Sequence, residues 1–164
     1  MIGFMVDVSV RAMTQVEFDE WWDGVVRSYA ASQIAAGTWS PDTALELARQ
    51  NNATLLPDGF ATPGMLLLHA VRGDGTRVGV LWIGLTHPRG VSDCAFLYDI
   101  EVGEEHRGVG YGRALLVAAE DMVRSHGVGR LELNVFGSNA RALGLYESAG
   151  YRVVTQQMRK NLGP

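Results

Sequence analysis

The chain has 164 residues, of which 47% are hydrophobic and 20% are charged. This size and composition are typical of one globular domain and exclude a disordered chain. The formal net charge of −4 argues against a general nucleic-acid binder, because phosphate contacts require a basic surface. A single cysteine, Cys94, excludes a disulfide within the chain and a cysteine-based metal cluster.

Cellular location is predicted from what the sequence lacks. No apolar run approaches the ~20 residues of a membrane span, and residues 1–10 lack the basic start and long apolar core of a signal peptide. We therefore expect a reducing, cytoplasmic compartment and no membrane partner. Cys94 lies in an apolar, strand-like run, where a small core residue is expected rather than a catalytic thiol.

The first elements in chain order are a strand and a long helix. Residues 5–11 alternate and are rich in valine, which predicts a strand. Thr14 and Glu17 have the spacing of a capping box, and large apolar side chains recur behind them at helical spacing. We expect a helix over 14–36. Its apolar stripe comprises Phe18, Trp21, Trp22, Val25 and Tyr29.

A second helix and a hairpin follow. Ser40-Pro41 is typical of an N-cap and a first helical residue, which predicts a helix over 41–53. The apolar runs 65–71 and 78–85 are separated by a glycine-containing connection, which is typical of a β-hairpin.

The remaining elements alternate between strand and helix. The predicted strands span 95–102, 130–136 and 151–158, and the predicted helices span 112–126 and 139–148. A hairpin is antiparallel, whereas strand–helix–strand crossovers join parallel strands. The order of elements therefore predicts an α/β fold on a mixed sheet, in one domain over residues 1–164.

A glycine-rich segment, Arg107-Gly108-Val109-Gly110-Tyr111-Gly112, connects the strand 95–102 to the helix 112–126. Glycine lets the backbone approach a ligand closely, and the following helix presents unpaired N–H groups and the positive end of its dipole. Phosphate oxygens bind at such sites. The segment predicts a phosphate-bearing cofactor; a tight turn that merely uses glycine is the weaker alternative, because Arg107 and Arg113 lie beside it.

Two other phosphate-binding motifs fit this segment less well. A P-loop requires a lysine after its last glycine, but Arg113 follows Gly112. The dinucleotide fingerprint requires a third glycine where this chain has Arg113 or Leu115. Glu132, about twenty residues further on, lies where a ribose-binding acid is expected, so a nicotinamide- or flavin-binding enzyme stays open as an alternative.

The pattern Arg-x-x-Gly-x-Gly over residues 107–112 resembles the acetyl-CoA signature of the GNAT N-acetyltransferase superfamily. Residues 98–102 resemble the central strand of that family, and residues 139–151 resemble its closing helix, with an asparagine leading to a tyrosine and then Gly-Tyr. The resemblance is close over about 95–155 and concerns only the order of elements before that.

The resemblance implies a GNAT-like fold, with a mixed, mostly antiparallel sheet of six to seven strands flanked by about four helices. It implies acetyl-CoA as cosubstrate and direct acetyl transfer, within a ternary complex, to a primary amine of a small molecule, peptide or protein. A non-catalytic acyl-CoA-binding sensor is the alternative from another class. Edge strands in this architecture often pair between subunits, so a homodimer is compatible with the sequence.

The resemblance also assigns cofactor-binding residues. The backbone N–H groups of residues 108–112 would hold the pyrophosphate, with added charge from Arg107 and Arg113. A bulge around Ile100 and Val102 would free backbone groups for pantetheine, and the N–H of Val102 would polarise the thioester carbonyl. The side chain of Asn139 would bind the pantetheine or phosphate arm.

Two proton-transfer roles remain to be assigned. Tyr146 shares a helix face with Asn139, seven residues earlier. The resemblance implies that its hydroxyl is presented to the thioester sulfur. Without the resemblance, a core tyrosine would be expected. A thiol has a pKa of about 8.5 and a tyrosine about 10, so this transfer needs a positioned hydrogen bond. For the base, Asp99 and Glu101 alternate onto one face of the strand. Glu101, acting directly or through water, is expected to be the base because it is nearer the oxyanion position. The alternatives are Asp99, or two carboxylates that only cap or pair with arginines.

The acceptor site must come from the N-terminal half. Trp21, Trp22, Tyr29 and Trp39, with the loop 56–65, either line a pocket or pack as core. The four histidines lack the spacing of metal ligands, so no metal site is predicted.

Overall fold

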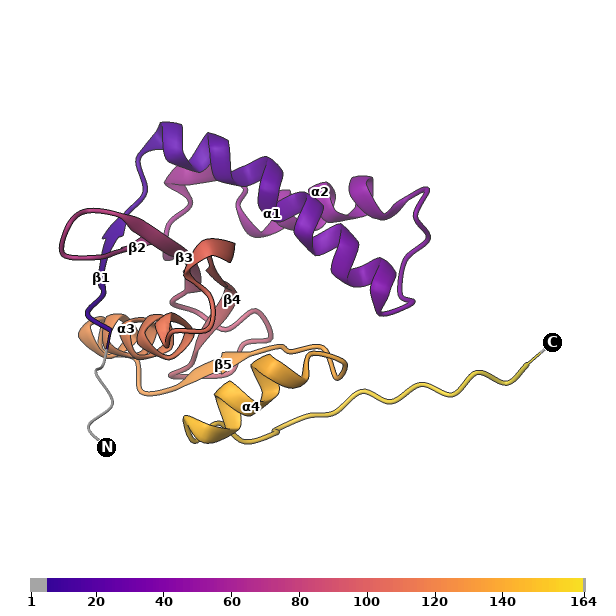
Figure 1. The fold of residues 1–164 in the computed structure, drawn as a ribbon. Coiled ribbons are helices and arrows are strands. Elements are labelled where there is room, and N and C mark those ends of the chain that lie inside the picture. The colour runs from indigo at the N-terminus through magenta and orange to yellow at the C-terminus, as the bar shows by residue number, and fades with distance from the viewer. Residues whose placement is uncertain (1–5, 164) are drawn as a thin grey trace.

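The computed structural model describes residues 6–163. The helices are α1 (Gln15–Ala35), α2 (Ala44–Leu55), α3 (Tyr111–Ser125) and α4 (Ala140–Ser148), with short 3-10 turns at Gly59–Ala61 and Glu104–His106. The strands are β1 (Ser9–Ala12), β2 (Met65–Val71), β3 (Arg77–Gly84), β4 (Ala95–Val102) and β5 (Leu131–Leu133). They form one sheet in the order β1-β2-β3-β4-β5, in which only the β4–β5 pair is parallel (Figure 1). The predicted α/β class, the mixed and mostly antiparallel sheet and the four helices are confirmed.

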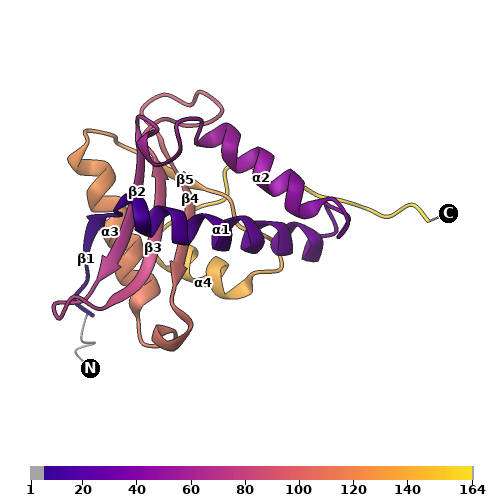
Figure 2. The ribbon, with the colours of Figure 1, turned by 90° about the horizontal axis from the view of Figure 1, so that it is seen from above.

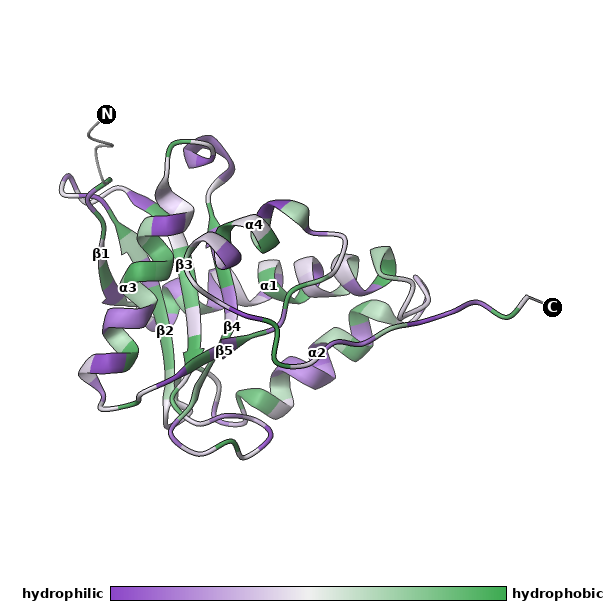
Figure 3. Cartoon of the chain, turned by 90° about the horizontal axis from the view of Figure 1, so that it is seen from below, coloured by the Kyte–Doolittle hydropathy of each residue, from purple (hydrophilic) through white to green (hydrophobic). Residues whose placement is uncertain are grey.

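The sheet lies between two layers of helices. Helices α1 and α2 cover one face, and α3 and α4 lie on the other (Figures 1 and 2). The main core fills the α3 side, where Leu81 and Ile83 of β3 pack against Leu115 and Leu116 of α3 with almost no exposed surface. Apolar residues accordingly concentrate on the strands and on the inner helix faces (Figure 3). Burial of this apolar surface is what holds the helices on the sheet.

Helix α1 begins as predicted and α2 begins later than predicted. Thr14 accepts a hydrogen bond from the Glu17 N–H (3.2 Å) and donates its own N–H to the Glu17 carboxylate (2.9 Å), which completes the capping box. The Ser40 carbonyl accepts from the N–H groups of both Thr43 and Ala44, so the residues between them form a turn before α2. Within the described part of the chain, no helix combines the length and apolarity needed to cross a bilayer.

The expectation of six to seven strands is wrong, because the sheet has five strands over residues 6–163. The predicted last strand, 151–158, forms no strand, and every residue of 152–163 is exposed. Its alternation is real, but a strand also needs a partner for its N–H and C=O groups, and this segment has none in the described chain. The first strand is shorter than the predicted 5–11, of which Met5 lies outside the described residues.

Strands β4 and β5 diverge, and this divergence positions the site. They pair only between Ala95–Leu97 and Leu131–Leu133. Beyond Leu97, β4 continues to pair with β3 alone. A wedge therefore opens between β4 and β5 at one side of the sheet.

Candidate active site

A β-bulge in β4 sets which side chains enter this wedge. Asp99 lies opposite Trp82, and Leu97 lies opposite Ile83, so Tyr98 is an extra residue in the ladder. The bulge therefore lies earlier than the expected position around Ile100 and Val102, which stay in regular register with β3. It places Tyr98 on the α1 side, where its ring stacks on Trp82 with centroids 4.9 Å apart.

The outer edge of β4 presents free backbone N–H groups to the wedge. The N–H of Gly103 donates to the Val78 carbonyl on the β3 side (2.9 Å). Because N–H directions alternate along a strand, those of Val102 and Ile100 point the other way, into the wedge. The backbone geometry thus fits an extended ligand that pairs like a strand, as the resemblance implies.

The glycine-rich segment forms an uncapped helix start. Gly108 and Gly110 have φ values of +85° and +102°, where side chains are strained. Gly110 is the N-cap of α3 and supplies no side-chain hydrogen bond, so the N–H groups of the first turn face outward. A Cβ at Gly110 would lie 3.1 Å from Cγ2 of Val6. This cradle fits phosphate oxygens.

The other residues assigned to the cofactor differ in what their side chains contact. Arg107 donates through Nε to the Val102 carbonyl (3.0 Å), which ties the loop to β4. Arg113 donates to the Ser148 hydroxyl at the end of α4, away from the loop start. The side chain of Val109 is exposed and that of Tyr111 is buried in the core, so both could offer only backbone groups to a phosphate.

A cleft of about 130 Å³ lies in the wedge between β4, α4 and the residues after β5. Its polar lining consists of Asp99, Asn134, Asn139 and Tyr146. Asn139 caps α4 by accepting from the Ala142 N–H (3.1 Å), which leaves its amide group available. Asn139 and Tyr146 face the same cleft, as their spacing predicts.

The carboxyl group of Asp99 in this cleft has a strongly shifted pKa. Its pKa is raised from 3.8 to about 7, first by burial and then by the nearby charge of Glu101. Although the residue is only half-buried, its Oδ2 atom is buried and, like Trp21 Nε1, has no hydrogen-bond partner within residues 6–163. Burial, and then the charge of Asp99, also raises the pKa of Tyr146.

Glu101, the base chosen from the sequence, lies in a different environment. Its side chain is 51% exposed, and its carboxylate lies 3.6 Å from Arg107 Nη2. This carboxylate is solvated and paired, unlike the buried Oδ2 of Asp99. The structure therefore brings Asp99, not Glu101, together with Tyr146.

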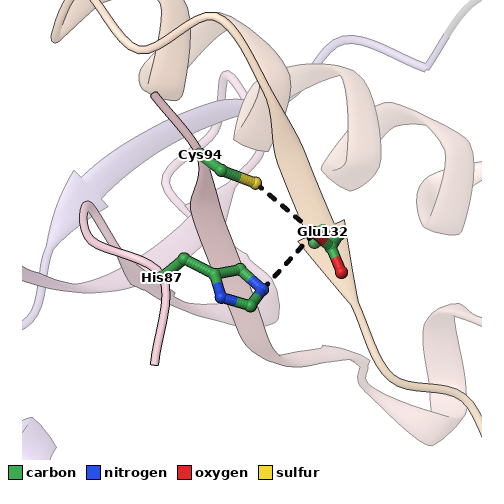
Figure 4. Close-up of side chains that lie close together, drawn as sticks. All are labelled: His87, Cys94 and Glu132. Carbon is green, nitrogen blue, oxygen red and sulfur yellow. Dashed lines mark hydrogen bonds and ion pairs between the residues drawn. The ribbon is translucent and has the colours of Figure 1, made fainter. Parts of the chain in front are cut away.

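The structure also forms a polar cluster that the sequence analysis did not find. Glu132 Oε2 lies 3.4 Å from Nε2 of His87 and 3.7 Å from Sγ of Cys94 (Figure 4), and Glu132 Oε1 accepts from Arg89 (3.2 Å). Residues 87 and 94 come from the loop between β3 and β4, and residue 132 comes from β5, so no local spacing could reveal them. Glu132, weighed above as a ribose-binding acid, is already occupied by these partners.

The ring orientation of His87 argues against a metal site in this cluster. His87 Nδ1 accepts from the Arg89 backbone N–H (3.1 Å), so in the neutral ring the proton lies on Nε2, the atom that faces Glu132. A metal ligand needs a lone pair at that atom. Burial and the carboxylate of Glu132 raise the pKa of the Cys94 thiol, which makes it a poor nucleophile.

The fold, the wedge and the glycine cradle together define an acyltransferase of the GNAT type. The family model "Acetyltransferase (GNAT) family" matches residues 24–151. The chain belongs to the acetyltransferase (GNAT) family, in which acetyl transfer from acetyl-CoA to an amine is the general reaction.

Individual relatives agree with this assignment. The uncharacterized N-acetyltransferase YycN of Bacillus subtilis is 34% identical over 155 residues, which cover 94% of this chain and 99% of YycN. Its crystal structure superposes with a TM-score of 0.90 over 96% of this chain and 100% of that one. The uncharacterized N-acetyltransferase YdgE of the same organism is 31% identical, covering 94% and 98% of the two chains. The PaiA N-acetyltransferase of Thermoplasma acidophilum, solved in complex with coenzyme A, shares the fold at 20% identity, with a TM-score of 0.63 over 92% and 93% of the chains.

Proposed function

We propose that residues 1–164 act as one N-acetyltransferase domain that moves the acetyl group of acetyl-CoA directly to a primary amine. The observation that carries the proposal is the position of Asp99 and Tyr146 in one cleft, beside the free N–H edge of β4. Acetyl-CoA would supply a thioester, whose carbonyl carbon an amine can attack. The coenzyme A complex of PaiA, on the same fold, supports this choice of cosubstrate.

Backbone groups would do most of the binding. The uncapped start of α3, after Gly108 and Gly110, would hold the pyrophosphate, and Arg107 would add positive charge at its edge. The Ile100 and Val102 N–H groups would pair with the pantetheine arm, and the free amide of Asn139 lies on the opposite wall of the cleft. The Val102 N–H would stabilise negative charge developing on the carbonyl oxygen.

Two side chains would move protons. Asp99 would accept a proton from the acceptor's ammonium group, a role that its pKa of about 7 suits at neutral pH. Tyr146 would donate its phenolic proton to the departing sulfur. Cys94 is buried, and its thiol donates to the Glu132 carboxylate. This supports direct transfer without an acetylated cysteine.

The surroundings of Asp99 favour a cationic acceptor group. The ring of Trp82 stacks on Tyr98 and meets the ring of Trp21 edge-on, at centroid distances of 4.9 and 5.6 Å. Aromatic faces beside a carboxylate attract an ammonium ion. Trp21 is thus proposed to contact the acceptor, whereas the buried Phe18 and Val25 of the same stripe are core.

The proposed function is tested by amine-dependent release of free thiol from acetyl-CoA, with wild type and Tyr146→Phe. We expect the variant to lower kcat by about 10²-fold, near the lower end of acid–base effects, because a thiolate of pKa about 8.5 leaves without full protonation. The affinity for acetyl-CoA should stay within about twofold, as measured by calorimetry.

The matched control is Tyr151→Phe. Tyr151 has a buried hydroxyl, and its ring lies 5.8 Å from that of Tyr146, so the same chemical change is made next to the site. Unchanged turnover in Tyr146→Phe, or an equal loss in both variants, would contradict the role of Tyr146. No thiol release with any of a broad set of amines would contradict the proposed reaction.

A further inference from the structure

Helix α4, which carries Tyr146, is attached to the rest of the molecule by little buried surface. It has nine residues, of which Tyr146 alone is buried. The bond of its N-cap, Asn139, stays within the helix. Over residues 6–163, the bond from Arg113 to the Ser148 hydroxyl is the only hydrogen bond that joins α4 to another helix or strand. This bond is therefore placed to set the position of the helix.

The bond comes from the turn of α3 that forms the phosphate cradle. Arg113 lies in the first turn of α3, directly after the glycine-rich segment. The adjacent Gly112 approaches the same turn of α4, because a Cβ at Gly112 would lie 3.4 Å from Cδ2 of Leu145. The Ser148 hydroxyl in turn donates to the Leu145 carbonyl (2.9 Å). Tyr146 thus lies between the two residues of α4 that contact the first turn of α3.

The two arginines beside the glycine-rich segment have different partners. Arg107 donates to the Val102 carbonyl at the start of the loop, whereas the guanidinium of Arg113 is directed at the end of α4. A charged donor makes a stronger hydrogen bond than a neutral one. Because a misplacement of about 1 Å can lower a rate by about 100-fold, a contact that fixes α4 against the cradle bears directly on proton transfer by Tyr146.

We propose that Arg113 is a positioning residue, which holds Tyr146 at the departing sulfur through Ser148 and does not bind the pyrophosphate. This inference rests on the proposed function, since it takes Tyr146 as the proton donor. The turn of α3 that receives the phosphates is then also the turn that fixes the proton donor. Both ends of the cosubstrate, the pyrophosphate and the thioester sulfur, are held in one frame.

A double-mutant cycle tests whether Arg113 acts through Tyr146. In the thiol-release assay, Arg113→Ala should lower kcat by about tenfold, and Ser148→Ala should do the same. In a Tyr146→Phe background, the further loss from Arg113→Ala should be less than about twofold, because the hydroxyl that it positions is gone. An equal loss in both backgrounds, or wild-type kcat in Arg113→Ala, would overturn the proposal.

Acetyl-CoA affinity separates positioning from phosphate binding. By calorimetry, the dissociation constant of Arg113→Ala should stay within about threefold of wild type. A loss of about tenfold or more that shrinks at high salt would assign Arg113 to the phosphates and overturn the proposal. Arg124→Ala is the matched control, because Arg124 lies on the same helix and its hydrogen bonds in the described chain go to Glu120 and Asp121. It should keep wild-type kcat and affinity.

Failure of the proposed function is read from a different sample. No thiol release by wild type would contradict the reaction, and the contact itself is then tested by amide hydrogen exchange in the presence of CoA. Arg113→Ala and Ser148→Ala should each speed exchange in α4, while the second half of α3 should exchange as in wild type. Unchanged exchange in α4 would show that the bond does not hold the helix and would overturn the proposal.

Discussion

Replacing Asp99 by Asn is expected to lower kcat/KM for the amine by about 10³-fold at pH 8, within the range of acid–base effects. The amide cannot accept the proton that an ammonium acceptor must lose before it attacks. Because the pKa of Asp99 is about 7, wild-type kcat/KM should rise with pH through about 7 as the carboxylate ionises. The measurement is thiol release at a series of pH values, and the rise near pH 7 should be absent in Asp99→Asn.

The comparison with Glu101→Gln decides between the two carboxylates of the strand. Glu101 is exposed and paired with Arg107, so its amide variant should lose less than about tenfold and keep the rise near pH 7. A loss confined to Glu101→Gln would restore the choice made from the sequence and remove Asp99 from the mechanism.

Asp99→Asn should also stabilise the protein above neutral pH. The pKa of Asp99 is raised from 3.8 to about 7 in the folded state, so the unfolded state binds fewer protons between these values, and stability falls as pH rises through this window. The amide variant should therefore have a free energy of unfolding higher than that of wild type at pH 8, by at most about 4 kcal/mol, and a similar one at pH 4. Thermal unfolding at the two pH values measures this difference. This gain, together with the loss of activity, would separate a catalytic carboxylate from a structural one.

Gly110→Asp is expected to weaken acetyl-CoA binding by about 100-fold or more. Gly110 has a φ of +102°, where an L side chain costs of order 1–3 kcal/mol, and a Cβ there would lie 3.1 Å from Val6. The added carboxylate would also repel the phosphates at the start of α3. Calorimetric titration with acetyl-CoA measures the change.

Two variants separate charge from strain in this experiment. Gly24→Asp adds the same charge at an exposed position of α1, with nothing within 4 Å of the new Cβ, and should bind like wild type. Gly110→Ala adds strain without charge and should fall between wild type and Gly110→Asp. Wild-type affinity in Gly110→Asp would refute the assignment of this segment to the phosphates.

Local signals predicted the parts of the fold that local chemistry determines. The capping box of Thr14 and Glu17 sets the start of α1, and the glycines 108 and 110 adopt the positive φ values that only glycine tolerates easily. The shared face of Asn139 and Tyr146 follows from helix geometry alone. Each of these depends on residues at most a few turns apart.

The choice between Asp99 and Glu101 depends on contacts that are distant in the sequence. The bulge at Tyr98 is fixed by register against β3. Asp99 lies opposite Trp82, which packs against Trp21 of α1, and it lines the cleft beside α4. Simple alternation along β4 made the two carboxylates equivalent. The cluster of His87, Cys94 and Glu132 was missed for the same reason.

The segment 151–158 shows the limit of a strand pattern. Alternation and β-branched residues predict that a segment can form a strand, but not which edge it pairs with. In the described chain no edge accepts it. The strand count was wrong because pairing is a property of the assembled sheet.

Thermal unfolding in the presence of acetyl-CoA tests the central claim most directly, namely that the wedge and the glycine cradle bind this cosubstrate. At a hundred times its dissociation constant, a ligand adds about 2.7 kcal/mol, which for a chain of this size raises the midpoint by about 5–10 °C. We expect this shift with acetyl-CoA and with CoA, and not with NADPH or ATP. A shift with NADPH alone, or no shift with any of the four, would contradict the account.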